Sequence, residues 1–562
     1  MSKLIGVLAL ALLACAVTPS SVSAHGNNPC PRPDPGTIVA PPPDLYSSNG
    51  VLNASFDYYT TVDSAGRTLF CFVTPDDLQS PTLHVRPGDT LNLSVTNRNP
   101  KPPPGSPTEV VANASDRCGD VTMTITSLNV HFHGTNTPPA CHSDQIVHTI
   151  INSGQTFNYS VQFPVTEPPG LYWYHPHVHG LSEAAVQGGA SGAIIVEGIE
   201  NVQPAVAGLP ERVLFIRDQI PDPTISSCQT PGAILPSGAT VPSWDVSLNY
   251  VPVLCPSFSP AVIEMKPGQQ EFWRVANASA DTIIDLQVRY DGAVQPLQVV
   301  ALDGVPTGSQ DGTMQGQLVA QTDILLAPAA RAEFIVTGPS AKVKNASFLT
   351  QNIDTGPDGD TDPRRTLAGI VATASPTPLP VIRSPSLPAK HELFEGLANA
   401  PVTAKRTLYF SEVLSDPSNP ASATNFFITV DGATPTLFDP NNPPAIVTRQ
   451  GAVEDWIIQN RSQENHEFHM HQLHFLLLER NGAPVPPGAK SIPRYDPSPV
   501  LDQYGTLSER QGADGFSGDG RRRLCLSLPH SRTRRRGHDG DCPSAAAITG
   551  PRAVPRKASH RR

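Results

Sequence analysis

Three stretches of the chain repeat one layout, in which two strand-like segments flank a short turn and the second segment ends in asparagine. The first contains the turn Pro87-Gly88-Asp89, the second runs from Met265 to Asn277, and the third runs from Thr448 to Asn460. Apolar and polar residues alternate in the first stretch, which is typical of half-buried strands in a sandwich, and proline with glycine forms the turn. The repetition predicts three similar β units.

The composition favours an all-β chain. Proline (61 residues) and glycine (42) are abundant and charged residues make up only 16%, which suits many short strands joined by turns. A length of 562 residues is also too great for one core. We place the units at residues 45–198, 205–375 and 400–494, with a Pro/Ser-rich linker at 376–388 between the last two.

The first 24 residues have the pattern of a secretory signal peptide. Lys3 is followed by an apolar run from Leu4 to Val17 and by the small-residue site Val22-Ser-Ala24. The segment Leu12-Leu-Ala-Cys15 allows an alternative, a lipoprotein processing site with Cys15 lipidated. We therefore expect a secreted or periplasmic protein, and no other apolar run is long enough to span a bilayer.

Export permits disulfides. Once Cys15 and two cysteines of the C-terminal tail are set aside, six remain: Cys30, Cys71, Cys118, Cys141, Cys228 and Cys255. None lies in a Cys-x-x-Cys motif, which argues against zinc or a redox pair. Proximity in the sequence favours Cys118–Cys141 and Cys228–Cys255, whereas the full connectivity does not follow from sequence.

Histidine is concentrated in three pairs: His131 with His133, His175 with His177, and His469 with His471. Residues i and i+2 of a strand point to the same side, so each pair can reach one site and six imidazoles can converge. Imidazole suits copper, zinc, iron or nickel, so the ligand type alone does not choose the metal. His466 lies an odd number of residues before His469 and is expected to face a different centre. The roles of His179 and His474 stay open.

The segments Leu128–Gly134, Leu171–Gly180 and His466–His471 resemble the first three copper motifs of the multicopper oxidases, of the laccase and ascorbate oxidase type. The resemblance spans residues 45 to 494. It implies an all-β chain of three cupredoxin-like Greek-key β-sandwich domains, the third of them incomplete. The second unit contains no His-x-His pair, and we expect it to be structural.

The resemblance also implies a role for each histidine. The type 2 copper would be held by His131 and His469. Four of the six ligands of the type 3 copper pair would be His133, His175, His177 and His471. His466 would bind the type 1 blue copper. Such enzymes take single electrons at type 1 copper and pass them to the three-copper cluster, where dioxygen is reduced to water. Because that reduction needs four electrons, a multi-copper store avoids releasing partly reduced oxygen.

The family's fourth motif, His-Cys-His-x3-His-x4-Met, is missing. Its cysteine, downstream histidine and methionine bind type 1 copper, and its two flanking histidines complete type 3. After Pro493 the strand pattern ends, and residues 495–562 form an aberrant basic tail that we expect to be disordered. Residues 521–562 hold twelve Lys and Arg against two Asp, so this part carries +10 and the first 520 residues carry −21 of the total −11.

A shifted reading frame explains this tail better than nucleic-acid binding does. Synonymous codons for Leu526–Asp541 exist that, read one base out of register, encode Tyr-His-Cys-His-Ile-Leu-Glu-His-Glu-Asp-Ala-Gly-Met-Met-Ala. This peptide contains the whole fourth motif at the family's spacing. We hypothesise a frameshift close to Arg494, in the gene or in its reading.

Two functions follow from these patterns. The first is a secreted, copper-dependent, laccase-like oxidoreductase that oxidises phenols, aromatic amines or low-valent metal ions, with dioxygen as acceptor. The second is a non-catalytic copper-binding or copper-detoxification protein, inactive because its type 1 ligands are missing. A Met-rich insert, which would have indicated a cuprous-ion oxidase, is not visible among only five methionines. We expect a monomer that binds no nucleic acid, and the natural substrate does not follow from the sequence.

Overall fold

The computed structural model describes residues 28–480, apart from 112–116, 308–315, 384–396, 420–421, 423, 440–441 and 450. Beyond residue 480 it describes the backbone of four strands, at 483–484, 505–512, 521–522 and 526–527. The expected signal peptide, Cys15 and most of the tail therefore lie outside the described residues. No helix among the described residues is long and apolar enough to cross a membrane.

Strands make up 43% of the described residues and helices 4%, which confirms the predicted all-β class. The first unit is a sandwich of a five-stranded and a four-stranded sheet. The five-stranded sheet has the order β1 (Asp44–Tyr46), β4 (Thr82–Val85), β13 (Gly192–Val196), β12 (Gly170–His175) and β9 (His131–His133). The four-stranded sheet has the order β11 (Thr156–Gln162), β5 (Thr90–Asn97), β2 (Val51–Val62) and β3 (Thr68–Val73). Apolar side chains from both sheets form one buried cluster.

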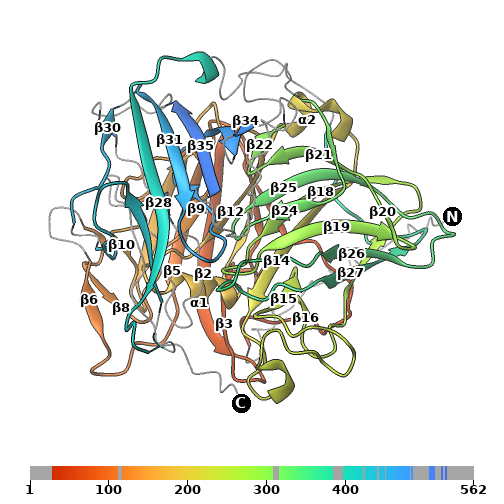
Figure 1. The fold of residues 1–562 in the computed structure, drawn as a ribbon. Helices are drawn as coiled ribbons and strands as arrows, with labels where there is room; N and C mark the ends of the chain where they lie inside the picture. Colours follow the sequence, from red (N-terminus) through yellow and green to blue (C-terminus); the bar gives the residue numbers. More distant parts are fainter. Residues whose placement is uncertain are drawn as a thin grey trace, which may run out of the picture.

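The second unit pairs an eight-stranded with a six-stranded sheet around another apolar cluster. The larger sheet contains β16 (Val251–Val253), β15 (Asp245–Leu248), β14 (Glu211–Gln219), β18 (Gln270–Asn277), β25 (Arg331–Thr337), β21 (Leu297–Leu302), β22 (Val305–Pro306) and β23 (Val319–Gln321). The smaller contains β17 (Ala261–Met265), β27 (Arg365–Ala372), β26 (Ala346–Thr350), β19 (Ile284–Tyr290), β20 (Ala293–Val294) and β24 (Ile324–Leu326). In Figure 1 the first and third units lie side by side, and the second unit lies at the right of the view.

The third unit has one six-stranded sheet and a smaller apolar cluster that includes Trp456. The sheet has the order β29 (Thr424–Val430), β28 (Ala404–Leu414), β31 (Val453–Asn460), β35 (Gly505–Gly512), β33 (Leu476–Arg480) and β34 (Ala483–Pro484). Four two-stranded pairs complete the strands: β6 (Thr108–Val110) with β8 (Thr122–Thr124), β7 (Cys118–Gly119) with β10 (Thr149–Ile150), β30 (Thr448–Arg449) with β36 (Arg521–Arg522), and β32 (His469–Met470) with β37 (Leu526–Ser527). The short helices are α1 (Ser182–Gln187) and α2 (Ile199–Val202), with 3-10 turns η1 (Pro204–Val206), η2 (Ser226–Cys228) and η3 (Leu397–Asn399).

The tail differs from our expectation that no strand follows Pro493. Strand β35 lies between β31 and β33, and it pairs with β31 along all eight of its residues, from Gly505 to Gly512. The physical reason is that the edges of β31 and β33 would otherwise present rows of unpaired backbone groups, which favour pairing with any available extended segment.

The repeated layout corresponds to a repeated set of contacts in the second and third units. Trp273 donates its indole N–H to Glu271 at 2.9 Å, and Glu271 also accepts from Arg212 on the neighbouring parallel strand β14. In the third unit Trp456 donates to Glu454 at 2.9 Å, and Glu454 accepts from Arg406 on β28. Each buried indole thus has a hydrogen-bond partner that is itself ion-paired, which lowers the cost of burying both polar groups.

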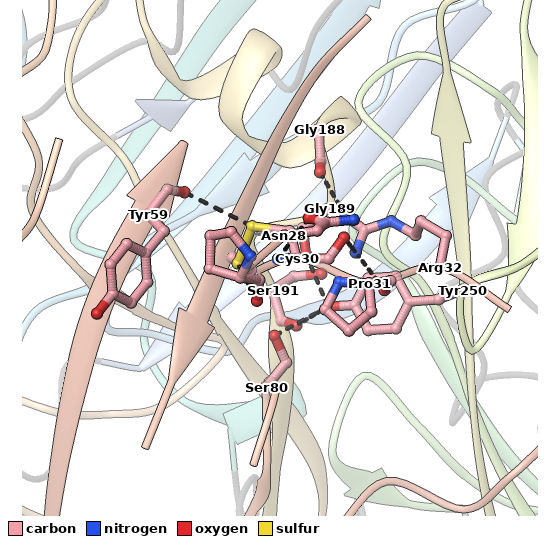
Figure 2. Close-up of a disulfide and its surroundings, with 12 residues drawn as sticks. Asn28, Cys30, Pro31, Arg32, Tyr59, Ser80, Gly188, Gly189, Ser191 and Tyr250 are labelled. Carbon is pink, nitrogen blue, oxygen red and sulfur yellow. Dashed lines mark hydrogen bonds between the residues drawn. A yellow bond between two sulfur atoms is a disulfide. The ribbon is translucent and has the colours of Figure 1, made fainter. Parts of the chain in front are cut away.

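Three disulfides join the six cysteines of the described residues. Both predicted pairs, Cys118–Cys141 and Cys228–Cys255, are confirmed, and Cys30 pairs with Cys71. Figure 2 shows the surroundings of Cys30, where Arg32 donates to the Gly188 carbonyl at 2.8 Å and lies over the ring of Tyr250 at 4.4 Å. The segment that follows Cys30 is therefore held against both the first and the second unit.

His84 on β4 makes the stability of the first unit depend on pH. Its ring nitrogens contact Glu197 at 2.7 Å and Asp44 at 3.1 Å. Burial lowers the pKa of His84, but the two carboxylates outweigh burial and raise that pKa from 6.5 to about 9. Since the pKa is higher in the folded chain, the stabilisation is fully present below pH 6.5 and is lost as the pH rises through 9.

We therefore expect the destabilisation caused by His84→Gln to be largest near pH 6 and to shrink by about 3 kcal/mol at most by pH 10. Thermal or denaturant unfolding of both chains at the two pH values measures this difference. A difference in stability that is the same at pH 6 and pH 10 would contradict the charged contact.

Candidate metal centre

Two of the histidine pairs meet on neighbouring strands of the first unit. Strands β9 and β12 are antiparallel, with His131 opposite His175 and His133 opposite Trp173. His177 follows the end of β12, and its ring centroid lies 5.1 Å from that of His131. His175 Nε2 lies 3.4 Å from His133 Nδ1. The i, i+2 spacing therefore places these four imidazoles together, as the alternation of strand side chains predicts.

The third unit brings the last pair onto the same cluster. The ring of His469 stacks on that of His133 with centroids 4.2 Å apart, and the ring of His471 stacks on that of His131 at 4.4 Å. Possible ligand atoms of His131, His133 and His469 all lie within 4.8 Å of one another. Six imidazoles from segments far apart in the sequence thus form one site at the contact between the first and third units.

Neighbouring polar groups orient several of these rings. Asp144 contacts His131 Nδ1 at 2.9 Å and accepts the Phe132 N–H at 3.0 Å, while the side chain of Gln472 donates to its other oxygen at 3.3 Å. Burial raises the pKa of Asp144 to about 8, although the Phe132 and Gln472 hydrogen bonds favour the carboxylate. Such partners of a ligand's second nitrogen fix the orientation of the ring.

Asn129 and Trp173 contact His177 and His175, respectively. The side chain of Asn129 accepts the His177 N–H at 2.7 Å and donates to the Ile146 carbonyl at 2.7 Å. The indole of Trp173 stacks on His175 with centroids 4.2 Å apart. Asn129 and Trp173 lie inside the motifs quoted from the sequence, whereas Asp144 lies 13 residues after His131 and no sequence pattern marked it.

Burial favours the neutral form of three of the six imidazoles, which is the form that binds metal. Burial is the main cause that lowers the pKa values of His133, His469 and His471 well below 6.5. Both ring nitrogens of His471 and Nε2 of His469 are buried and have no hydrogen-bond partner among the described residues. Buried polar atoms without partners are costly, and a bound metal ion would satisfy them. The donor set therefore fits a copper site.

His466 packs against aromatic side chains of the third unit. Its ring stacks on Phe410 at 4.9 Å and meets Phe426 at 6.1 Å, inside the third unit. Burial lowers the pKa of His466 to about 3, and its Nε2 has no hydrogen-bond partner among the described residues. The tail segment in which further type 1 ligands would be sought falls outside the residues whose side chains are described.

Each of the two histidines of open role contacts a side chain from another segment. His474 contacts the Asn136 side chain at 3.2 Å, and burial lowers its pKa to about 4. The ring of His179 meets that of Phe438 at 5.1 Å.

Comparisons with known proteins agree with this site. Two family models described as multicopper oxidase match residues 122–201 and 412–503, which contain the first two and the third histidine pairs respectively. The multicopper oxidase MmcO of Mycobacterium tuberculosis is 25% identical over 272 residues, 43% of this chain and 48% of that protein. Multicopper oxidase LPR1 homolog 1 of Oryza sativa subsp. japonica is 29% identical over 173 residues, 28% of each chain. The chain thus spans about half or less of the length of these curated relatives.

Solved structures match over most of the chain. A variant of the McoA multicopper oxidase of Aquifex aeolicus has a TM-score of 0.59 at 16% identity and covers 88% of this chain and 96% of its own. A multicopper oxidase of Campylobacter jejuni, described as a metallo-oxidase, has a TM-score of 0.56 at 19% identity, with 86% and 90% covered. At such identities the likeness shows the fold, and the predicted class of cupredoxin-like sandwiches is confirmed.

Proposed function

Since the chain belongs to the multicopper oxidase family, we propose that it is a copper-dependent oxidoreductase of laccase-like type. Phenols, aromatic amines or low-valent metal ions would supply single electrons, and dioxygen would be reduced to water. We further propose that the protein is exported and acts as a monomer. The observation that carries the proposal is the meeting of three His-x-His pairs at one buried site between the first and third units.

Within this proposal, copper bound at the site supplies one-electron redox chemistry that amino-acid side chains lack. The six ligands would divide into two sets: His131 and His469 for type 2 copper, and His133, His175, His177 and His471 for the type 3 pair. Asp144 would hold the His131 ring so that its Nε2 is available to the metal, since Nδ1 is engaged by the carboxylate. Burial would keep the rings of His469 and His471 uncharged at neutral pH, so one nitrogen of each ring could bind a metal without first losing a proton.

A second function is favoured by one specific observation. No His-Cys-His motif occurs in the 562 residues, so the family's type 1 thiolate ligand and two type 3 histidines have no counterpart in the sequence. A chain with the six histidines alone would bind copper without turning over, as a copper-binding or copper-detoxification protein.

Copper content and oxygen consumption separate the two functions. The full chain would be loaded with Cu2+, its bound copper measured by atomic absorption, and oxygen uptake followed with a panel of phenols and with Cu+. An oxidase binds copper and consumes oxygen with at least one donor, whereas a copper-binding protein binds copper and consumes none. A chain that retains no copper after loading would overturn both proposals.

A further inference from the structure

The histidine-bearing strand β12 is held by side chains of the second unit as well as by its own sheet. On one side β12 pairs with β13 from Gly170 onward, but on the other side β9 pairs only with Trp173–His175. In an antiparallel sheet, the N–H and C=O of one residue point to the same neighbouring strand, and those of the next residue point to the opposite one. The N–H and C=O of Leu171 point to the side of β9, but β9 does not extend that far. In Figure 1, β12 lies between β9 and the strands β25 and β18 of the second unit.

Two side chains of β25 form the backbone hydrogen bonds of Leu171 that β9 is too short to form. Glu333 Oε1 accepts the Leu171 N–H at 2.8 Å, and Arg331 Nε donates to the Leu171 carbonyl at 3.2 Å. Residues 331 and 333 lie on the same face of β25, since strand side chains alternate, and both are almost completely buried. Together they satisfy both backbone groups of one residue, four positions before His175.

Arg331 also determines what can follow His133. A Cβ atom built on Gly134 would overlap Arg331 Nη2, and Gly134 has a φ of +85°, which disfavours any side chain. The guanidinium of Arg331 is 5.7 Å from the ring centre of Tyr172. One buried cation of the second unit thus contacts the ends of both β9 and β12, the two strands that carry His131, His133 and His175.

Both residues also form ion pairs or hydrogen bonds within the second unit. Arg274, which is fully buried, pairs with Glu333 and with Glu211. Arg331 Nη1 lies 3.3 Å from Asp303 Oδ1 and donates to the Ala329 carbonyl at 3.3 Å. Removing one member of such a buried network leaves the charges of its partners uncompensated, which is strongly destabilising. The charged groups therefore stabilise one another's positions.

We propose that Arg331 and Glu333 are positioning residues of the histidine site: they hold β12 and the turn at Gly134 so that His175 and His133 keep their spacing. The second unit, which we expected to be structural because it has no histidine pair, thereby takes part in the site. This inference rests on the proposed copper function only in so far as copper reports the spacing of the rings.

The main test compares Arg331→Met with Arg365→Met in the full chain. Arg365 is a suitable control because it is also a buried arginine of the second unit and donates to a backbone carbonyl, that of Trp244 at 2.6 Å. We expect Arg331→Met to weaken Cu2+ binding by about 10- to 100-fold and to change the electron paramagnetic resonance spectrum of bound Cu2+. Arg331→Lys, which keeps the positive charge, should bind Cu2+ more tightly than Arg331→Met does. Arg365→Met should leave affinity and spectrum unchanged even where it lowers the melting temperature.

Hydrogen exchange of the copper-free chain provides a readout that does not need metal. Arg331→Met should speed exchange of the backbone amides of residues 170–175, whereas Arg365→Met should not. If the wild-type chain binds no Cu2+, the proposed function fails and this exchange comparison alone decides the positioning role. Unchanged exchange in Arg331→Met, or equal losses in Arg331→Met and Arg365→Met, would overturn that role.

A double-mutant cycle tests the contact between Arg331 and Gly134 through stability alone, without copper. Gly134→Ala should slow or prevent proper packing of Arg331, so its effect on the melting temperature should be smaller in an Arg331→Met background than in the wild type. Additive effects of the two substitutions would show that residue 134 and Arg331 do not constrain each other, and would overturn the proposal.

Discussion

A chain of these 562 residues is expected to show no intense blue absorption and to consume oxygen on the order of 10³-fold more slowly than a chain whose reading frame is restored near Arg494. The family's blue colour needs a cysteine thiolate on type 1 copper, and the cluster needs two histidines from the same motif. When several groups act as one catalytic unit, removing one of them abolishes most of the activity. A chain with only some of the copper ligands should therefore not keep a matching share of the oxidase activity.

DNA sequencing around the codon of Arg494 comes first, because it decides whether a shifted frame encoding the fourth motif exists. Both chains would then be loaded with copper and compared by visible absorption and oxygen uptake. A restored chain carrying His466→Ala is the matched control, because it should lose the blue band while keeping the six other histidines. A blue, phenol-oxidising preparation of the unrestored chain would contradict the prediction, as would DNA with no compatible shifted motif.

Replacing His471 by leucine is expected to have opposite effects on copper binding and on the stability of the metal-free chain. Both ring nitrogens of His471 are buried without a hydrogen-bond partner among the described residues, and each such atom costs about 1–3 kcal/mol. Leucine is apolar, so it removes that cost while still filling space. The melting temperature of the metal-free chain should therefore stay the same or rise, while Cu2+ affinity falls by at least about tenfold.

Thermal unfolding with and without Cu2+ measures both effects at once. Copper should raise the melting temperature of the wild type, because it binds the folded chain, and should raise that of His471→Leu far less. His84→Gln is the contrasting control: it should lower the metal-free melting temperature at pH 6, because His84 has two carboxylate partners, and should leave the copper-induced increase intact. A metal-free His471→Leu chain that melts well below the wild type would show that His471 has a structural role.

His84 and His471 are both buried, but they differ in their hydrogen-bond partners. His84 is buried with charged partners and stabilises the fold, whereas His471 is buried without them and is tolerated because the surrounding sandwiches supply the stability. Unfavourable burial of this kind is typical of functional sites, where stability is given up for chemistry.

Local patterns accounted for much of the fold. The strand period placed each histidine pair on one side of its strand, and turns that contain glycine, two of them with proline before it, marked the repeated units. Sequence proximity was enough for two of the disulfides, whereas Cys30–Cys71, 41 residues apart, depends on how the N-terminal segment packs against β3. The strand β35 was not predicted, because a sheet edge can recruit an extended segment that has no strong strand pattern of its own.

The sequence by itself determined the all-β class, the three-unit repeat and the histidines that can share a site, because alternation and turn chemistry act over a few residues. Only the tertiary structure decided that the pairs of the first and third units face one another, that Asp144 orients His131, and that Arg331 and Glu333 of the second unit hold β12. These contacts join residues far apart in the chain. They depend on the packing of whole sandwiches, which is the sum of many weak apolar contacts and leaves no periodic signal in the sequence.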